Sequence, residues 1–150
     1  MSEFRELYQE VILDHGKNPR NFREAMAGEL TAHGHNPLCG DKIQVHVEVE
    51  NEKIKSVAFH GSGCAISTAS ASMMTQALKG RTVQEAETMF QSFHNLITGT
   101  DEPEAALAGL GKLAVFSGVR EFPVRVKCAT LAWHTFKAAL ERSGQPASTE

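Results

Sequence analysis

Hydrophobic residues near the start of the chain recur at the spacing of an amphipathic helix. Between about residues 3 and 15 they lie on one helical face. Gly16 and the Asn18-Pro19 step disfavour further helix, so we expect the helix to end there. The residues of this apolar face are Phe4, Leu7, Tyr8, Val11 and Ile12.

The hydrophobic period changes to strict alternation in the next part of the chain. Residues 43–49 alternate apolar with polar side chains, which is typical of a strand that buries one face. Asn51-Glu52 indicates a turn, and residues 54–60 indicate the returning strand. Residues 21–37 are polar and irregular, with one short strand expected around Leu30. These segments predict a small antiparallel sheet.

Helical periodicity returns in the second half of the chain. A helix rich in alanine and methionine is predicted from Ala65 to the stop at Gly80. Thr82-Val83-Gln84-Glu85 is a capping box that opens a further helix to about Ile97. Residues 101–118 are broken by glycine and are expected to be helical in pieces. Residues 124–142 are predicted to form the last helix.

The order of strands first and helices after them predicts one α+β domain over residues 1–150. We expect its N-terminal helix at about 3–15, its sheet at about 28–60, its helical part at about 65–142 and a frayed tail at 145–150. A chain of 150 residues is long enough to bury its own core.

Charge and cysteine content exclude several classes of function. Fifteen basic against 18 acidic residues leave a formal charge of −3, which gives no basic footprint for nucleic acid. No apolar stretch approaches the roughly 18–20 residues of a membrane span, and the N-terminus lacks the apolar segment of a signal peptide. Three cysteines cannot all pair within one chain. We therefore expect a reduced, cytoplasmic protein that binds neither nucleic acid nor membrane.

All three cysteines lie at the ends of predicted elements. Cys39 lies in the turn Asn36-Pro37-Leu38-Cys39-Gly40-Asp41, Cys64 closes the loop Gly61-Ser62-Gly63, and Cys128 lies at the start of the last helix. Functional groups concentrate in loops that a rigid scaffold carries. The intervals between the cysteines match no local zinc-finger spacing, so only the fold can bring these side chains together.

Three thiolates and the Asp41 carboxylate would complete a four-coordinate zinc site. Gly40 gives the turn the freedom to aim both Cys39 and Asp41 at one point. A helix N-terminus, predicted for Cys64 and Cys128, favours a thiolate. The alternative from the residues alone is that the cysteines are buried filler and that Asp41 caps its own turn.

Other motifs give weaker indications. Gly61-Ser62-Gly63 lacks the Gly-Lys-Ser/Thr ending of a phosphate-binding loop. A cysteine hydrolase has no identifiable nucleophile–base pair in the sequence. His33, His35 and His60 flank the cysteine loops and are candidates for contacts to the metal ligands, whereas His46 is expected on the polar face of its strand.

Taken together, the cysteine motifs resemble the SufU branch of the IscU/NifU-type iron–sulfur assembly proteins over about residues 4–140. The resemblance implies an α+β fold with a small three-stranded antiparallel sheet packed against several helices. The matching stretches are Leu7-Tyr8 through Asp14-His15, Lys17-Asn18-Pro19-Arg20-Asn21, Asn36 to Asp41, Gly61 to Ser67, Ala69 to Thr75 and Phe122 to Trp133.

The resemblance also implies a cofactor, a mechanism and partners. Zn²⁺ would be bound by Cys39, Asp41, Cys64 and Cys128. Cys39 would be the catalytic nucleophile of a sulfurtransferase, taking persulfide sulfur from a SufS-type cysteine desulfurase that carries pyridoxal phosphate. A downstream Suf cluster-assembly scaffold would then receive the sulfur.

Departures from IscU-type scaffolds favour sulfur transfer. Lys127 stands where IscU has a histidine, residues 90–119 resemble the SufU insertion, and Phe122-Pro123-Val124-Arg125 replaces the chaperone-docking motif of IscU. Lys127 and Arg125 are therefore predicted supporting residues, with Arg125 stabilising negative sulfur or, alternatively, pairing with Asp41 or a surface acid. The alternative function is an IscU-like scaffold with iron or an iron–sulfur cluster in place of zinc, because thiolates bind both.

Overall fold

The computed structural model describes residues 2–37, 40–98, 110–120, 122–141 and 147–148. The helices are α1 (Ser2–Lys17), α2 (Ala65–Leu78), α3 (Val83–Thr98) and α5 (Pro123–Leu140), with a 3-10 helix η1 (Gly111–Val119) before α5. The strands are β1 (Leu30–Asn36), β2 (Asp41–Glu50), β3 (Lys53–Ser62) and the short β4 (Ala147–Ser148).

The sheet has the strand order β3-β2-β1-β4. Strands β1 to β3 run antiparallel to their neighbours, which confirms the predicted three-stranded antiparallel sheet. The prediction of a frayed tail is wrong for Ala147 and Ser148, which pair in parallel with Gly34 and His35 of β1. An edge strand presents unpaired backbone groups, and these accept a short segment whose composition alone does not indicate a strand.

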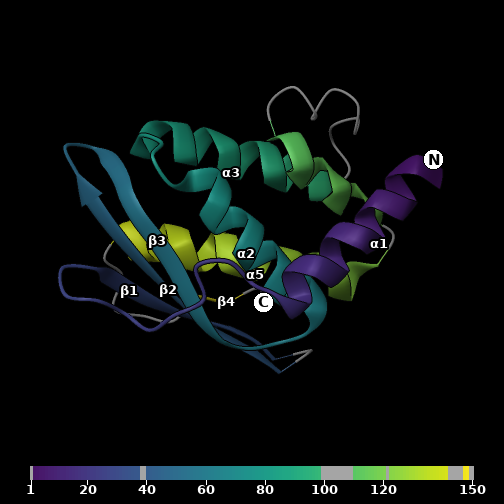
Figure 1. The fold of residues 1–150 in the computed structure, drawn as a ribbon, viewed down its shortest axis with the longest axis horizontal. Coiled ribbons are helices and arrows are strands. Elements are labelled where there is room, and N and C mark those ends of the chain that lie inside the picture. Colours follow the sequence, from purple (N-terminus) through teal and green to yellow (C-terminus); the bar gives the residue numbers. More distant parts are fainter. Residues whose placement is uncertain (1, 38–39, 99–109, 121, 142–146, 149–150) are drawn as a thin grey trace.

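Helices cover one face of the sheet (Figure 1). Helix α5 packs against β1 and β2, α2 packs against α5, and α1 packs against α2. Gly34 allows the close approach of β1 to α5, because a Cβ at this position would overlap Thr135 Oγ1. This contact fixes α5, and therefore Cys128, relative to the strands that flank the Cys39 turn.

The core lies between the inward face of the sheet and the helices. Val45 and Val47 of β2 are fully buried against it. Trp133 of α5 stacks on Phe93 of α3 with ring centroids 4.5 Å apart, and its indole N–H donates to Ser70 Oγ of α2 over 3.2 Å. The buried aromatic contact therefore joins three helices into one layer.

His46 is buried, although its place in the alternation predicts an exposed polar side chain. Its ring nitrogens lie 2.8 Å from Thr31 Oγ1 and 2.9 Å from His60 Nδ1, and none of its surface is exposed. Burial, together with the neighbouring His60, lowers the pKa of His46. Both ring nitrogens have partners, which explains how a polar residue of the outer face tolerates burial.

The segment before β1 is fixed by a partly buried ion pair. Both terminal guanidinium nitrogens of Arg23 donate to the Glu29 carboxylate, at 2.9 and 2.7 Å, and Ser56 Oγ of β3 donates to it as well. The Glu29 side chain is 1 % exposed. The Arg23 hydrogen bond is the main cause that lowers the pKa of Glu29 from 4.5 to about 2.

Acid should therefore weaken the fold through Glu29. Because the folded-state pKa lies below the unfolded one, its stabilisation is present above about pH 5 and is lost as the pH falls towards 2. We expect Glu29→Gln to lower the free energy of unfolding by about 2–3 kcal/mol at pH 7 and by much less at about pH 3. The figure at pH 7 allows for solvent screening, because Arg23 is half-exposed. Urea unfolding at both values measures this, with exposed Glu50→Gln as the control. An equal loss at both pH values would contradict the assignment.

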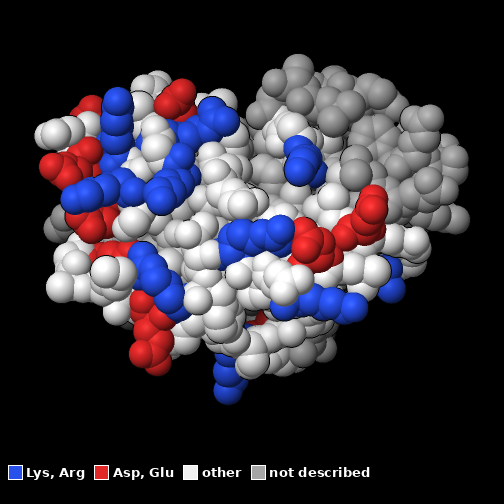
Figure 2. Space-filling view, in the orientation of Figure 1, with Lys and Arg blue, Asp and Glu red and all other residues white. Residues whose placement is uncertain are grey.

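The molecular surface carries both signs of charge. On the face shown in Figure 2, lysine and arginine side chains are interspersed with aspartate and glutamate side chains. Within the described ranges, every helix is too short or too polar to cross a bilayer.

Candidate metal centre

Asp41, the first residue of β2, is a buried carboxylate held from two sides. Its Oδ1 accepts from the backbone N–H of Cys64 over 2.9 Å, and its Oδ2 accepts from the Asn36 amide over 3.3 Å. The residue has no exposed surface. Because a buried carboxylate is stable only when it is paired or coordinates a metal, this environment suits a ligand to a cation.

Cys64 begins α2 as its N-cap residue, as the sequence predicts. Its backbone is extended, and its Sγ accepts from the N–H of Ser67 over 3.4 Å. Free N–H groups and the helix dipole at this end stabilise a negatively charged sulfur. The local sequence thus places the Cys64 sulfur at the N–H end of α2.

Cys128 lies in the second turn of α5 rather than at its start, because this helix begins at Pro123. The dipole argument for a thiolate therefore applies to Cys64 and fails for Cys128. The Cys128 side chain is 1 % exposed, and its Sγ lies 3.4 Å from the donor amide of Asn36. The hydrogen-bond donor to this sulfur is therefore the side-chain amide of Asn36 rather than the N–H groups of a helix N-terminus.

The fold brings these three predicted ligands together. One ligand atom each of Asp41, Cys64 and Cys128 lies within 4.8 Å of the other two, and among the described residues this is the single group of its kind. Donors that share one zinc ion at about 2.0–2.3 Å lie within about 4.6 Å of one another, so the set fits zinc with small movements. Two sulfurs and one oxygen, from buried Asp41 and Cys128 and partly exposed Cys64, are a soft donor set that zinc and iron both accept.

The predicted fourth ligand, Cys39, lies outside the described residues. The backbone on both sides of it is described: the N–H of Gly40 donates to the carbonyl of Asn36 over 2.8 Å, and Gly40 has a φ of +72°. Asn36 and Asp41 are directly paired across β1 and β2. The turn that contains Cys39 therefore begins and ends beside the cluster, and Gly40 has the positive φ that glycine adopts readily; that Cys39 points at the same site as Asp41 stays a prediction.

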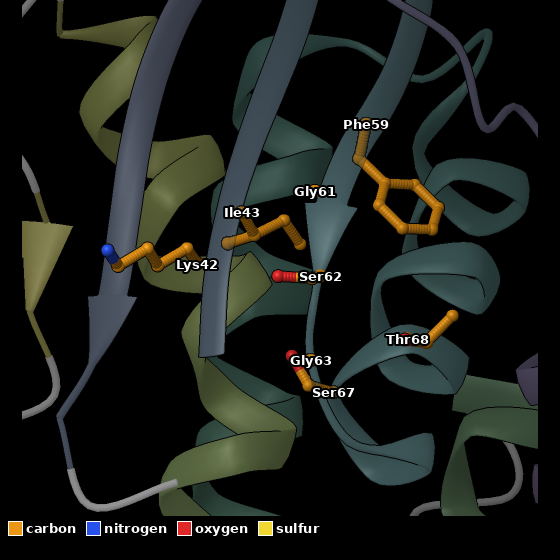
Figure 3. A pocket seen from close by; sticks show the side chains of 8 residues that line it. All are labelled: Lys42, Ile43, Phe59, Gly61, Ser62, Gly63, Ser67 and Thr68. Atoms are coloured by element: carbon orange, nitrogen blue, oxygen red, sulfur yellow. The ribbon is translucent and has the colours of Figure 1, made fainter. Parts of the chain in front are cut away.

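A narrow pocket lies between the ends of β2 and β3 and the start of α2 (Figure 3). Gly63 lies beside Ser67 at its lower end in this view. The pocket has a volume of about 10 Å³, which leaves room for roughly one water molecule. This pocket is therefore far too small for an organic substrate, which typically needs roughly 300 Å³ or more.

The three histidines suggested by the sequence do not join the cluster. His33 and His35 are exposed, and they alternate along β1 with the buried residues Gly34 and Asn36. His60 contacts His46. Within the described parts of the chain, no histidine lies in the metal-ligand group. The predicted contact is therefore wrong for Asp41, Cys64 and Cys128, because these histidines lie on the opposite face of the sheet, and contact with Cys39 stays a prediction.

The two predicted supporting residues lie on α5 just before Cys128. The Arg125 guanidinium lies 4.6 Å from the ring centroid of Phe122, and none of the ion pairs between described residues includes it. The alternative pairing with Asp41 is thus not found. Lys127 is half-buried and directly precedes Cys128. Their supporting roles stay predictions.

Asn36 is the site residue that the sequence did not single out. Its side chain touches both Asp41 and Cys128, whereas the sequence suggested only its membership in the turn motif. A confident strand assignment for residues 30–36 would have placed Asn36 on the inward face with Ala32 and Gly34. The polar composition of that segment hid the alternation.

A side chain at Gly63 is predicted to disturb the metal-ligand cluster. A Cβ at this position would lie 2.9 Å from Asp41 Oδ1 and 3.2 Å from Ser67 Oγ, so Gly63→Ala must push the carboxylate away from the Cys64 N–H. We expect a loss of about 1–3 kcal/mol in unfolding free energy and weaker zinc binding. Thermal unfolding and chelator competition measure both, with Gly16→Ala, whose added Cβ meets only ordinary contacts, as the control. Unchanged zinc binding would contradict the proposed crowding.

Comparisons of the sequence with a family profile and with individual proteins agree on one family. The sequence profile of the NifU-like N terminal domain matches residues 7–129. An iron–sulfur cluster assembly scaffold protein named IscU, from Streptococcus pyogenes serotype M1, is 40% identical over 143 residues, which cover 95% of this chain and 88% of that protein. A zinc-dependent sulfurtransferase named SufU, from Bacillus subtilis strain 168, is 38% identical over 136 residues, covering 91% and 90%.

The fold comparison agrees with the sequence comparison. A crystal structure described as a cluster assembly scaffold for the SUF system, from Fervidobacterium islandicum AW-1, superimposes with a TM-score of 0.80 at 34% identity. The match covers 90% of this chain and 97% of that one. Residues 7–129, which the family profile matches, include all three converging ligands.

Proposed function

The chain belongs to the NifU-like N-terminal domain family, whose relatives assemble iron–sulfur clusters, and from that premise we propose that it is a zinc-dependent sulfur acceptor. The observation that carries the proposal is the convergence of Asp41, Cys64 and Cys128 on one point. Cys39, two positions before Asp41, is proposed as the fourth ligand and the sulfur-accepting nucleophile. Bound zinc would keep the cysteine ligands deprotonated near neutral pH.

The sulfur donor is proposed to be a cysteine persulfide on a SufS-type desulfurase. The Cys39 thiolate attacks the terminal sulfur of that persulfide and forms a new sulfur–sulfur bond. The sulfur–sulfur bond on the donor breaks at the same time, and the donor cysteine leaves as a thiolate. One sulfur atom moves without any external oxidant or reductant, because one persulfide replaces another.

The two cationic residues of α5 that precede Cys128 have distinct proposed roles in this transfer. Arg125 lies three residues before Cys128, and we propose that it stabilises negative charge on the transferred sulfur. Lys127 adds a second positive charge. The two other cysteines are less available for attack, since Cys128 is buried and Cys64 accepts a backbone hydrogen bond.

A cluster scaffold is the second candidate, and the names of two relatives favour it. The Streptococcus pyogenes and Fervidobacterium islandicum proteins are both described as scaffolds. Against it stands Lys127, where the scaffold resemblance calls for histidine: an ammonium group has no free lone pair for iron at neutral pH. Three cysteines cannot all pair within one chain and suit a reducing compartment, and we infer a cytoplasmic location.

One experiment separates the two functions. The purified chain is analysed for metal and acid-labile sulfide and then added to a SufS-type desulfurase with cysteine as substrate. Sulfur acceptance predicts one colourless zinc per chain, faster alanine release, and a gain of one sulfur atom on Cys39 in the mass spectrum. Bound iron with labile sulfide and unchanged desulfurase turnover would favour the scaffold and overturn the proposal.

A further inference from the structure

Asn36 touches two of the three converging ligands with a single nitrogen. Its Nδ2 lies 3.3 Å from Asp41 Oδ2 and 3.4 Å from Cys128 Sγ. The first distance is long for an N–H···O bond, whereas the second is ordinary for the larger sulfur atom. The amide carries two hydrogens, so it can donate to both acceptors at once. Asn36 itself is completely buried.

The position of Asn36 in the fold makes it a link between distant segments. It is the last residue of β1, faces Asp41 across the sheet, and accepts the Gly40 N–H through its carbonyl. Its side chain reaches Cys128, 92 residues further along the chain. Asn36 therefore contacts the far end of the Cys39 turn, at Gly40 and Asp41, and also Cys128, the ligand that α5 supplies.

We propose that Asn36 is a positioning residue of the metal centre, which fixes Asp41 and Cys128 relative to each other and stabilises the Cys128 thiolate. The inference rests on the proposed metal-binding function and adds to it a residue that is not itself a ligand. Each described ligand then accepts at least one hydrogen bond from the scaffold: Asp41 accepts from the Cys64 N–H and from Asn36, Cys128 accepts from Asn36, and Cys64 accepts from the Ser67 N–H. The three ligands are thus organised independently of whatever occupies the remaining position.

Two measurable effects follow from these contacts. Removing a hydrogen-bond partner of a metal ligand typically lowers metal affinity by about 10–100-fold. An N–H donor also stabilises the lone pairs of the sulfur that accepts it. Without the donor, less energy is needed to move a sulfur electron to a bound metal, so a thiolate-to-metal absorption band shifts to longer wavelength.

The test compares zinc affinity and the cobalt spectrum of the full chain and its variants. Asn36→Leu keeps the branched shape of the side chain and removes the donor, and Asn36→Ser is too short to reach both acceptors. We expect both variants to bind zinc about 10–100-fold more weakly in competition with a chromophoric chelator. We also expect the thiolate-to-cobalt band of the Co²⁺-loaded variants to shift to longer wavelength. Should Asn36→Leu fail to fold by circular dichroism, Asn36→Ser decides the test.

Thr135→Val is the matched control. Thr135 is also fully buried and lies where α5 contacts β1, and its hydroxyl donates to the Leu131 carbonyl, away from the ligands. Asn36 variants that match Thr135→Val in zinc affinity and cobalt spectrum would overturn the positioning role alone. A parent chain that binds neither zinc nor cobalt stoichiometrically would overturn the proposed metal-dependent function itself.

Discussion

Replacing Cys39 by alanine is expected to leave a folded chain that takes up no sulfur from a persulfide donor. Alanine has no nucleophile, and the other two thiols are poor substitutes. Cys128 is 1 % exposed, and Cys64 caps α2 with its sulfur. Because the thiolate is the attacking group in sulfur exchange, its loss should reduce transfer to the background of the desulfurase alone. The fold should persist, since the whole of β1 pairs with residues 41–47 of β2 and these strands hold the turn from both sides.

The measurement is alanine release by a SufS-type desulfurase, with the persulfide on each cysteine followed by mass. Cys39→Ser is the matched variant, because it keeps the size and polarity of the side chain but replaces the thiol by a hydroxyl of much higher pKa. Both variants should abolish stimulation equally. Undiminished stimulation by Cys39→Ala would remove this residue from the proposed role, and sulfur found on Cys64 instead would reassign it.

The amino-acid pattern predicts the frame of the molecule well because its signals are local. Residues 43–49 alternate cleanly, and the structure buries Ile43, Val45 and Val47 as that alternation requires. The capping box at Thr82 is present in the structure: Glu85 N–H donates to Thr82 Oγ1, and Thr82 N–H donates back to Glu85. Sheet and helix starts follow from such short-range chemistry.

The pattern fails where a distant segment determines the environment. His46 occupies a polar position in the alternation, yet Thr31 and His60 on neighbouring strands give both its ring nitrogens partners and allow its burial. Ala147 and Ser148 have no strand signal of their own and pair because β1 offers an open edge. Neither outcome is encoded in the residues adjacent to these positions.

The metal centre combines both situations. Local sequence explains why Cys64 begins a helix, but the convergence of Cys64, Asp41 and Cys128 depends on how α2, β2 and α5 pack. The family resemblance predicted that convergence, whereas the spacing of the cysteines did not. The sequence does not indicate Asn36 for the same reason: its importance comes from a contact with Cys128, not from its neighbours in the turn.

Removal of zinc is expected to lower the melting temperature of the chain by about 10 °C. A ligand that binds only the native state at 1,000 times its dissociation constant stabilises it by about 4 kcal/mol. For a chain of 150 residues, each kcal/mol corresponds to about 2–4 °C. Without the ion, the Asp41 carboxylate and the two sulfurs remain within 4.8 Å of one another, so ionised ligands also repel. Differential scanning calorimetry before and after chelation measures the change.

Variants of the four proposed ligands should differ in how much added zinc raises their melting temperature. We expect Cys128→Ala and Cys64→Ala to abolish the rise in melting temperature when zinc is added back, because each removes one of the three converging ligands. Cys39→Ala should retain a smaller rise, since Asp41, Cys64 and Cys128 stay in place. Leu13→Ala, an exposed position on α1, should respond like the parent chain. A parent melting temperature that stays unchanged after verified metal loss would mean that the fold does not depend on the ion, and the converging ligands would then serve chemistry alone.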